Sequence, residues 1–420
     1  MKNKKGHFYL IKMATTNLQK ILLVSGLSIA IVLSIVLGIV FGVKNINSNK
    51  THHNSGTLRM IGYYQETATS NNCEGIQMMT PDKIPAQYYT HLVYGFAPRI
   101  KTDTWELDDP KSDAERYNSF NKLKEDHKNL KTLLSIGGDL PSVSPMSKMT
   151  SNKEWRKHFI DSSINFVKKY NFDGIDIDWE YPTDVDRGGS LDDKTGFTNL
   201  MKDFRDAINS DNSNLLLTAA LPGGSYWGKN YNVQETINYV DWFNIMAYNV
   251  LGSWKGEARC SSPLDSNTKT SNDSVRKSVD YFTQDLDKKK FNLGVSLWGI
   301  SYKLKDITSY DIGAPVYTSA EQPATPGFCT KQPGYLSWFE ISKILKDDNS
   351  VTHKSTFDKT EICKYFTYNN DQWVGYDDQD TFGEKLSFMK SQNLGGISVW
   401  GMDSDIPEEF TLTKFLNDNI

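Results

Sequence analysis

The chain has 420 residues, 38% of them hydrophobic and 12% aromatic, so it can bury a large core as either one barrel-sized domain or two ordinary ones. Its net charge of −4 comes from 47 basic and 51 acidic residues spread along the sequence, which gives no reason to expect a nucleic-acid partner. Basic residues gather only at the start of the chain.

The first 43 residues form a basic segment followed by an apolar one. Residues 1–20 contain five lysines and no acid, and residues 21–43 run 23 positions without a charge. That length spans a bilayer and exceeds the apolar core of a typical cleaved signal peptide. We therefore expect a cytoplasmic tail at 1–20 and a transmembrane anchor at 21–43, with the rest of the chain extracellular or lumenal. The alternative is a long signal peptide that is cleaved, leaving a secreted protein.

Residues 44–57 differ in composition from what precedes and follows them. They are rich in Asn, Ser, His and Lys without apolar periodicity, which predicts a flexible linker before a domain at 58–420. Two Asn-x-Ser/Thr patterns, at Asn49 and Asn272, fit glycosylation acceptors, although this pattern is frequent by chance.

All four cysteines follow the apolar segment, as expected in a compartment where disulfides form. Of the three possible pairings we expect Cys329 with Cys363 and Cys73 with Cys260, but the sequence leaves the others open. No Cys-x-x-Cys or His-x-x-x-His spacing occurs, so we expect neither a metal site nor a cofactor.

Eight short segments rich in β-branched or other apolar residues are predicted to be strands. They are residues 59–64, 91–97, 132–136, 174–179, 215–220, 240–246, 292–296 and 396–400. Apolar spacings of three and four residues between several of them, as in Trp155, Phe159 and Ile160, predict helices. The alternation favours a closed (β/α)8 TIM barrel over an open sheet, although periodicity alone does not exclude the sheet.

One predicted connection is too long for a simple barrel. About 80 residues separate the seventh strand from the helix near Asp380, and they carry their own aromatic and Gly-Pro content. A structureless loop of that size is improbable in a compact domain, so we expect a small α+β subdomain at about 300–375. It would raise one wall of the barrel mouth, which suggests a groove for an extended ligand.

The most informative segment is the predicted fourth strand. Successive side chains on a strand point to opposite faces, so Asp176, Asp178 and Glu180 share one face. The other face is apolar, which is unusual for a solvated acidic strand. Three crowded carboxylates persist only if they share protons or stabilise a cation. The alternative is a partly exposed edge strand that happens to be acidic.

Aromatic and acidic residues gather at the carboxyl ends of the predicted strands, where such barrels carry their chemistry. Besides the acids, these ends carry Tyr63, Phe96, Gly137, Gly138, Met246, Tyr248, Asn249, Trp298 and Trp400. Aromatic rings stack on the apolar face of a sugar, and carboxylates supply protons and hydrogen bonds. The pattern therefore favours an oligosaccharide over a nucleotide.

Residues 135–138 (Ser-Ile-Gly-Gly), followed by 173–180, resemble the paired signatures of the glycoside hydrolase family 18 chitinases. The resemblance runs from Arg59 to the carboxyl terminus and includes 246–248 and 395–400. It implies a (β/α)8 barrel with an α+β insertion after the seventh strand. It also implies hydrolysis of β-1,4-N-acetylglucosamine linkages in chitin or chitooligosaccharides by a substrate-assisted retaining mechanism.

This resemblance assigns a role to each acid. Glu180 would protonate the glycosidic oxygen, and neighbouring anions should raise its pKa. Asp178 would orient the substrate's N-acetyl group and stabilise the oxazolinium, while Asp176 would share a proton with Asp178. Asp173 has the opposite parity and is interpreted as structural.

The resemblance also implies substrate contacts around the acids. Tyr248 would hydrogen-bond the acetamide oxygen, whereas Trp400, Phe96 and Met246 would form the floor under the cleaved sugar. The alternative for Phe96 and Met246 is a plain core position. The other expected substrate contacts are Tyr63, Tyr181, Asn249 and Trp298.

Three positions depart from the family pattern. Asp139 stands where the family usually has Trp, Asn249 where Asp is usual, and Ile300 where Arg is usual. These departures put the preferred substrate length and the reaction rate in doubt. Two alternative functions remain: an endo-β-N-acetylglucosaminidase acting on N-glycans, and a chitin-binding lectin. Lectin-like relatives typically lack the acid that this chain retains at Glu180.

Overall fold

The computed structural model describes residues 58–420 except 66–72, 74–78, 140–142, 253–254, 267–272 and 348. The expected tail, anchor and linker, together with Asn49 and Asn272, lie outside the described residues. Within the described part of the chain, no helix is both long enough and apolar enough to cross a membrane.

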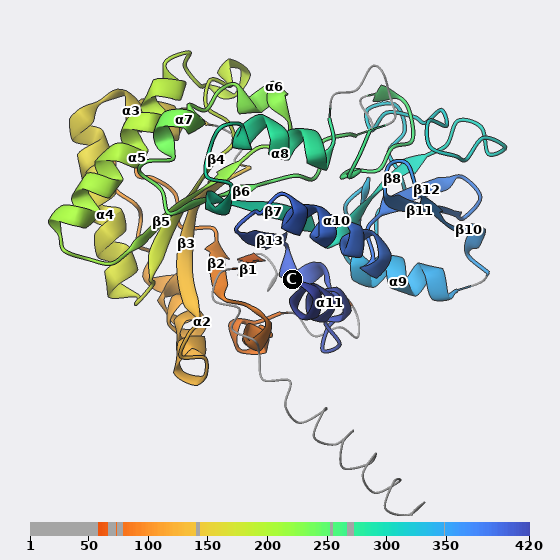
Figure 1. Ribbon diagram of the computed structural model, residues 1–420, viewed down its shortest axis with the longest axis horizontal. Coiled ribbons are helices and arrows are strands. Elements are labelled where there is room, and N and C mark those ends of the chain that lie inside the picture. The colour runs from red at the N-terminus through yellow and green to blue at the C-terminus, as the bar shows by residue number, and fades with distance from the viewer. Residues whose placement is uncertain are drawn as a thin grey trace, which may run out of the picture. The chain divides into compact units, whose positions relative to one another are not determined.

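Eight parallel strands close into a barrel, which confirms the predicted architecture (Figure 1). In chain order they are β1 (Arg59–Gln65), β2 (His91–Gly95), β3 (Lys131–Gly138), β4 (Gly174–Trp179), β5 (Leu216–Leu221), β6 (Trp242–Ile245), β7 (Phe291–Ser296) and β13 (Gly396–Trp400). The last strand, β13, closes the barrel between β7 and β1. Each predicted strand is present, although β6 is shorter than the expected 240–246.

Helices surround the barrel (Figure 1). They are α2 (Ala114–Asp126), α3 (Ser144–Ser151), α4 (Lys153–Lys169), α5 (Asp193–Ser210), α6 (Ser225–Gly228), α7 (Val233–Thr236), α8 (Val275–Thr283), α10 (Gln379–Ser391) and α11 (Thr411–Asn419). The predicted apolar stripe of α4, including Phe159 and Ile160, is buried in the main core. The Asn152 side chain starts this helix by accepting two backbone N–H groups.

Strand β4 divides its side chains as the sequence pattern predicts. Ile175, Ile177 and Trp179 belong to the core between the barrel and its helices, whereas Asp176 and Asp178 have the opposite parity. All six residues of the strand are buried, and β3 and β5 pair with it on either side. The acidic strand is therefore a central barrel strand, and the edge-strand alternative is wrong.

A second sheet occupies the long connection after β7. Its five antiparallel strands run in the order β10 (Val351–Asp358), β11 (Cys363–Tyr368), β12 (Gln372–Tyr376), β8 (Trp298–Lys303) and β9 (Tyr335–Ser337), with helix α9 (Trp338–Lys346) between β9 and β10. Figure 1 shows this sheet and α9 beside the barrel. Only Leu297 separates β7 from β8, so the sheet starts directly at the barrel mouth.

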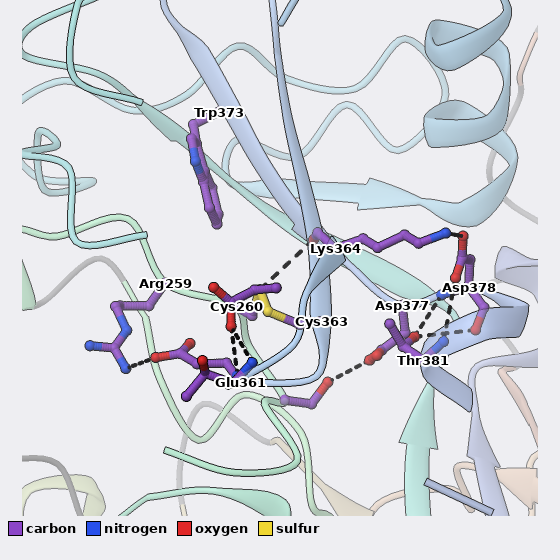
Figure 2. Close-up of a disulfide and its surroundings, with 12 residues drawn as sticks. Arg259, Cys260, Glu361, Cys363, Lys364, Trp373, Asp377, Asp378 and Thr381 are labelled. Carbon is purple, nitrogen blue, oxygen red and sulfur yellow. Dashed lines mark hydrogen bonds and ion pairs between the residues drawn. A yellow bond between two sulfur atoms is a disulfide. The ribbon is translucent and has the colours of Figure 1, made fainter. Parts of the chain in front are cut away.

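The structure pairs Cys73 with Cys329 and Cys260 with Cys363, so the expected pairing is wrong. Cys260 lies in the loop after β6, and this loop reaches the second sheet. There Cys260 packs in one apolar cluster with Cys363 and Trp373, as Figure 2 shows. The pairing depends on the path of that loop, which the spacing of cysteines along the chain does not reveal.

Candidate active site

A cavity of about 1590 Å³ lies at the carboxyl ends of the barrel strands. Ten of the eleven residues expected in the site line it: Tyr63, Phe96, Asp178, Glu180, Tyr181, Met246, Tyr248, Asn249, Trp298 and Trp400. The eleventh, Asp176, does not line the cavity and is fully buried. Strands far apart in the sequence thus bring the expected residues together.

Asp176 is held by three hydroxyl groups. Tyr63 and Ser135 donate to its Oδ2 at 3.0 and 2.8 Å, and Thr218 donates to its Oδ1 at 2.5 Å. Burial raises the pKa of Asp176, while the three hydrogen bonds oppose that rise by stabilising the anion. A proton shared with Asp178 stays a prediction, since the structure assigns the oxygens of Asp176 to these hydroxyls.

Asp178 and Glu180 both have a raised pKa, which favours their protonated forms. Burial raises the pKa of Asp178 well above its usual value, and the charges of Glu180 and Asp176 add to the rise. Oδ1 of Asp178 is buried without a hydrogen-bond partner among the described residues. Burial also raises the pKa of Glu180, whereas its hydrogen bond with Tyr181 lowers it. A protonated carboxyl at a cavity wall is what general-acid catalysis requires.

Two glycines at the end of β3 allow the acids and the floor to come together. A Cβ on Gly137 would lie 1.9 Å from the backbone oxygen of Asp178, and one on Gly138 would lie 2.6 Å from the Phe96 ring. Both glycines have positive φ, 126° and 86°, which other residues rarely adopt. The Gly-Gly pair is therefore a packing requirement of this site.

Aromatic rings form two groups in the cavity, and the rings within each group contact one another. In the first, Trp400 lies edge-on to Tyr63 and tilted against Phe96, each with ring centroids 5.5 Å apart. In the second, Trp298 contacts Tyr248 at 5.4 Å and Tyr335 at 5.2 Å. Phe96 and Trp400 are only partly buried and line the cavity, so their faces are available to a sugar ring.

The loop after β6 supplies three more expected residues. Burial raises the pKa of Tyr248 well above its usual value, and the carboxyls of Asp178 and Glu180 add to the rise, so the hydroxyl keeps its proton. Met246 is half-buried. Asn249 is exposed with φ of 52°, a left-handed conformation that Asn tolerates better than most side chains.

The structure gives two of the departures from the family pattern a specific environment. Asp139 is 81% exposed at the cavity wall and pairs with Arg187, with 2.9 Å between the guanidinium and the carboxylate. Asp139 raises the pKa of Glu180 and Arg187 lowers it. Ile300 is on β8 and packs against the core of the second sheet.

Sequence reasoning missed several residues of the cavity. Tyr226 and Trp227 line it from helix α6, and Trp227 stacks on Tyr181 with ring centroids 4.9 Å apart and planes 14° apart. Tyr335 lines it from β9. The signal for Tyr226 and Trp227 was their place after the fifth strand, where the same rule of strand ends applies.

Comparisons with known proteins agree with this fold. Residues 59–405 match the family described as Glycosyl hydrolases family 18. An endochitinase of Manduca sexta is 29% identical over 358 residues, covering 83% of this chain and 64% of that protein. The chain spans 14% to 66% of the length of the first curated relatives it matches.

Two solved structures are also similar to this chain. The Group IV chitinase of Ostrinia furnacalis, in complex with allosamidin, has a TM-score of 0.78 and 28% identity, covering 86% of this chain and 98% of that one. Human YKL-39, described as a pseudo-chitinase with retained chitooligosaccharide binding, has a TM-score of 0.77 and 27% identity, covering 86% and 99%. The chain belongs to glycoside hydrolase family 18, because that family matches it over residues 59–405, most of its length.

Proposed function

We propose that this protein hydrolyses β-1,4 linkages between N-acetylglucosamine units in chitin or chitooligosaccharides. The observation that carries the proposal is the pair at the carboxyl end of β4: Glu180 at the cavity wall with a raised pKa, and Asp178 near it with a buried oxygen that has no hydrogen-bond partner among the described residues. An unpartnered buried oxygen is costly unless a ligand satisfies it. The N–H group of an acetamide would do so.

The proposed mechanism uses the substrate's own acetamide as the nucleophile. Glu180 donates its proton to the glycosidic oxygen, and the bond between that oxygen and the anomeric carbon breaks. The acetamide oxygen bonds to the anomeric carbon and forms an oxazolinium, which Asp178 stabilises. The Glu180 carboxylate then takes a proton from water, whose oxygen attacks the anomeric carbon and restores the acetamide. Two inversions leave the anomeric configuration retained.

The aromatic residues and Tyr248 would serve binding and orientation in this mechanism. Trp400, with Phe96 beside it, would support the sugar that is cleaved, since its ring is accessible from the cavity. The Tyr248 hydroxyl keeps its proton and would donate it in a hydrogen bond to the acetamide oxygen. Tyr63, Tyr181, Met246, Asn249 and Trp298 are the further proposed substrate contacts.

The YKL-39 likeness makes binding without hydrolysis the alternative to test. Glu180 favours hydrolysis because its proton has no role in a purely binding protein. Product analysis after incubation with chitin oligomers and with a high-mannose glycoprotein separates chitinase, glycan-releasing enzyme and lectin. The Glu180→Gln variant should lose at least a thousandfold in rate because it removes the proton donor, while still binding chitooligosaccharide. Undiminished cleavage by this variant would refute the mechanism.

We also propose that residues 21–43 direct the catalytic domain out of the cytoplasm. The two disulfides support an oxidising compartment. A membrane anchor predicts that the expressed protein stays with membranes after a carbonate wash, whereas a cleaved signal peptide predicts a soluble, shortened product in the medium.

A further inference from the structure

A row of hydrogen-bonded polar side chains runs through the barrel interior from the half-buried Arg59 to the cavity wall at Asn244 and Tyr63. Nε of Arg59 donates to Oδ1 of Asn292 at 2.9 Å, and Nδ2 of Asn292 donates to Oδ1 of Asn244 at 2.8 Å. Nδ2 of Asn244 then donates to the Tyr63 hydroxyl at 2.8 Å, and that hydroxyl donates to Asp176 at 3.0 Å. We call Arg59, Asn292, Asn244 and Tyr63 the polar chain.

The arginine sets the direction of every bond in the polar chain. Because a guanidinium has donors and no acceptor, Nε of Arg59 must meet the carbonyl oxygen of the Asn292 side chain. The amide nitrogen of Asn292 is then the group that faces Asn244. The same constraint passes through Asn244, whose nitrogen faces the Tyr63 oxygen. The Tyr63 oxygen accepts from Asn244, so the Tyr63 hydroxyl hydrogen is available to donate to Asp176.

The strands around Arg59 leave room for its side chain. Arg59 opens β1, Asn292 is on β7, and Gly396 on the intervening β13 pairs with both in register. A Cβ on Gly395 would lie 1.7 Å from the guanidinium, so a larger residue there would displace it. The guanidinium also lies over the Trp242 ring, 4.9 Å from its centroid.

Charged groups around Arg59 keep it a cation near neutral pH. Burial lowers the pKa of Arg59 to about 10, although Asp241 and Asp287 oppose that fall. On the neighbouring strand, burial and the charge of Arg59 lower the pKa of His91 to about 4, so His91 is neutral. Arg59 therefore remains a hydrogen-bond donor to Asn292 near neutral pH.

The other end of the polar chain meets Asp176 among groups from four strands. Asp176 is faced by Tyr63 of β1, Ser135 of β3 and Thr218 of β5, and it shares a face of β4 with Asp178. Burial and the charges of Asp176 and Asp178 raise the pKa of Tyr63 well above its usual value. The Tyr63 hydroxyl therefore keeps the proton that it donates.

We propose that Arg59, Asn292 and Asn244 are positioning residues that keep the Tyr63 hydroxyl donating to Asp176 during hydrolysis. Three donors then hold Asp176 as the anion, and a proton shared by the two aspartates resides on Asp178, which lines the cavity. This inference rests on the proposed function, because it concerns the protonation of its catalytic acids. It assigns a part in the reaction to Arg59 and Asn292, which lie outside the cavity, and to Asn244 at its wall.

The Asn292→Asp variant of the full-length protein tests the direction of the chain. An aspartate at 292 still accepts from Arg59 but has no proton for Asn244. The Asn244 amide then rotates so that its nitrogen donates to the new carboxylate and its oxygen faces Tyr63. The Tyr63 hydroxyl donates to that oxygen and no longer to Asp176. We expect kcat to fall about tenfold with KM nearly unchanged. The acidic limb of the pH profile should move up by about one unit, because the Asp176 anion loses a donor.

Asn121→Asp is the matched control, because Asn121 is a buried amide outside the polar chain, bonded to Thr132 and to the Tyr117 carbonyl. It introduces the same carboxylate and should leave the pH profile unchanged. Should Asn292→Asp fail to fold, Asn244→Asp gives the same test, because its carboxylate accepts a hydrogen bond from the Tyr63 hydroxyl and draws it away from Asp176. A folded variant with the wild-type kcat and pH profile, or a control with the same shift, would overturn the proposal. A wild-type protein that cleaves no chitooligosaccharide would refute the proposed function and this inference with it.

Discussion

Glu180 combines burial with two opposing charges at the cavity wall. Burial raises its pKa, and of the two members of the adjacent ion pair, Asp139 raises it further while Arg187 lowers it. Asp139 stands where the family usually has a tryptophan, so a charged pair replaces an apolar ring next to the proposed acid. The side chain at position 139 therefore acts on Glu180 through its charge.

Neutralising Asp139 should shift the basic limb of the pH profile. Glu180 acts as an acid only while protonated, so activity falls as the pH rises through its pKa. Asp139→Asn removes a neighbouring anion, which lowers that pKa and moves the basic limb down. The shift should be a few tenths of a unit, because Asp139 is largely exposed and water screens its charge. Initial rates between pH 5 and 9 would measure it, and an unmoved or rising limb would contradict it. Asp103→Asn, at another cavity position, is the control.

At the scale of secondary structure, long periodic segments were predictable and short irregular ones were not. Strand β4 was recognised from its alternation of acidic and apolar side chains, and helix α4 from its apolar side chains at spacings of three and four. Helix α6 has only four residues, too few for a periodicity, so Tyr226 and Trp227 were missed. The expected start of β6 was wrong by two residues: Asp241 lies before the strand, and its carboxylate accepts from the backbone N–H of Leu217, near the start of the neighbouring strand β5.

Helix α6 should contribute to binding of longer substrates. Trp227 stacks on Tyr181 at the cavity wall, and Tyr226, 67% exposed, lies edge-on to it. Trp227→Ala removes both the ring and its support of Tyr181, so we expect KM for a chitohexaose to rise about tenfold, as loss of one aromatic contact of about 1.4 kcal/mol would give. Tyr281→Ala, an exposed aromatic outside the cavity wall, is the control. Equal KM values for the two variants would contradict this role.

At the scale of the whole molecule, contacts between distant segments escaped prediction. The closed barrel followed from eight strands and their helices, and the acids and aromatics at the strand ends followed from that barrel. The pairing of Cys260 with Cys363 did not, because it depends on where one loop crosses the second sheet. Arg59 was likewise overlooked, since its partner Asn292 is 233 positions away in the sequence.

A buried ion pair joins three parts of the molecule near that disulfide. Lys385 of α10 donates to Asp377, which follows β12, at 2.6 Å, and Ser262 of the loop after β6 donates to the same carboxylate at 2.8 Å. Both charged side chains are almost fully buried. The pair thus connects a barrel helix, the second sheet and the loop that continues from Tyr248.

Lys385→Met should destabilise the protein by about 3–5 kcal/mol, because it leaves the Asp377 carboxylate buried without its cation. The double variant Lys385→Met, Asp377→Leu should recover most of that loss, since it removes both charges together. Urea unfolding of the wild type and these variants measures both effects. Lys157→Met is the matched control, because its pair with Asp161 is exposed and contributes little. Equal losses for Lys385→Met and Lys157→Met would mean that burial adds nothing to this pair, and the second sheet would then be held to the barrel chiefly by its apolar contacts and the disulfides.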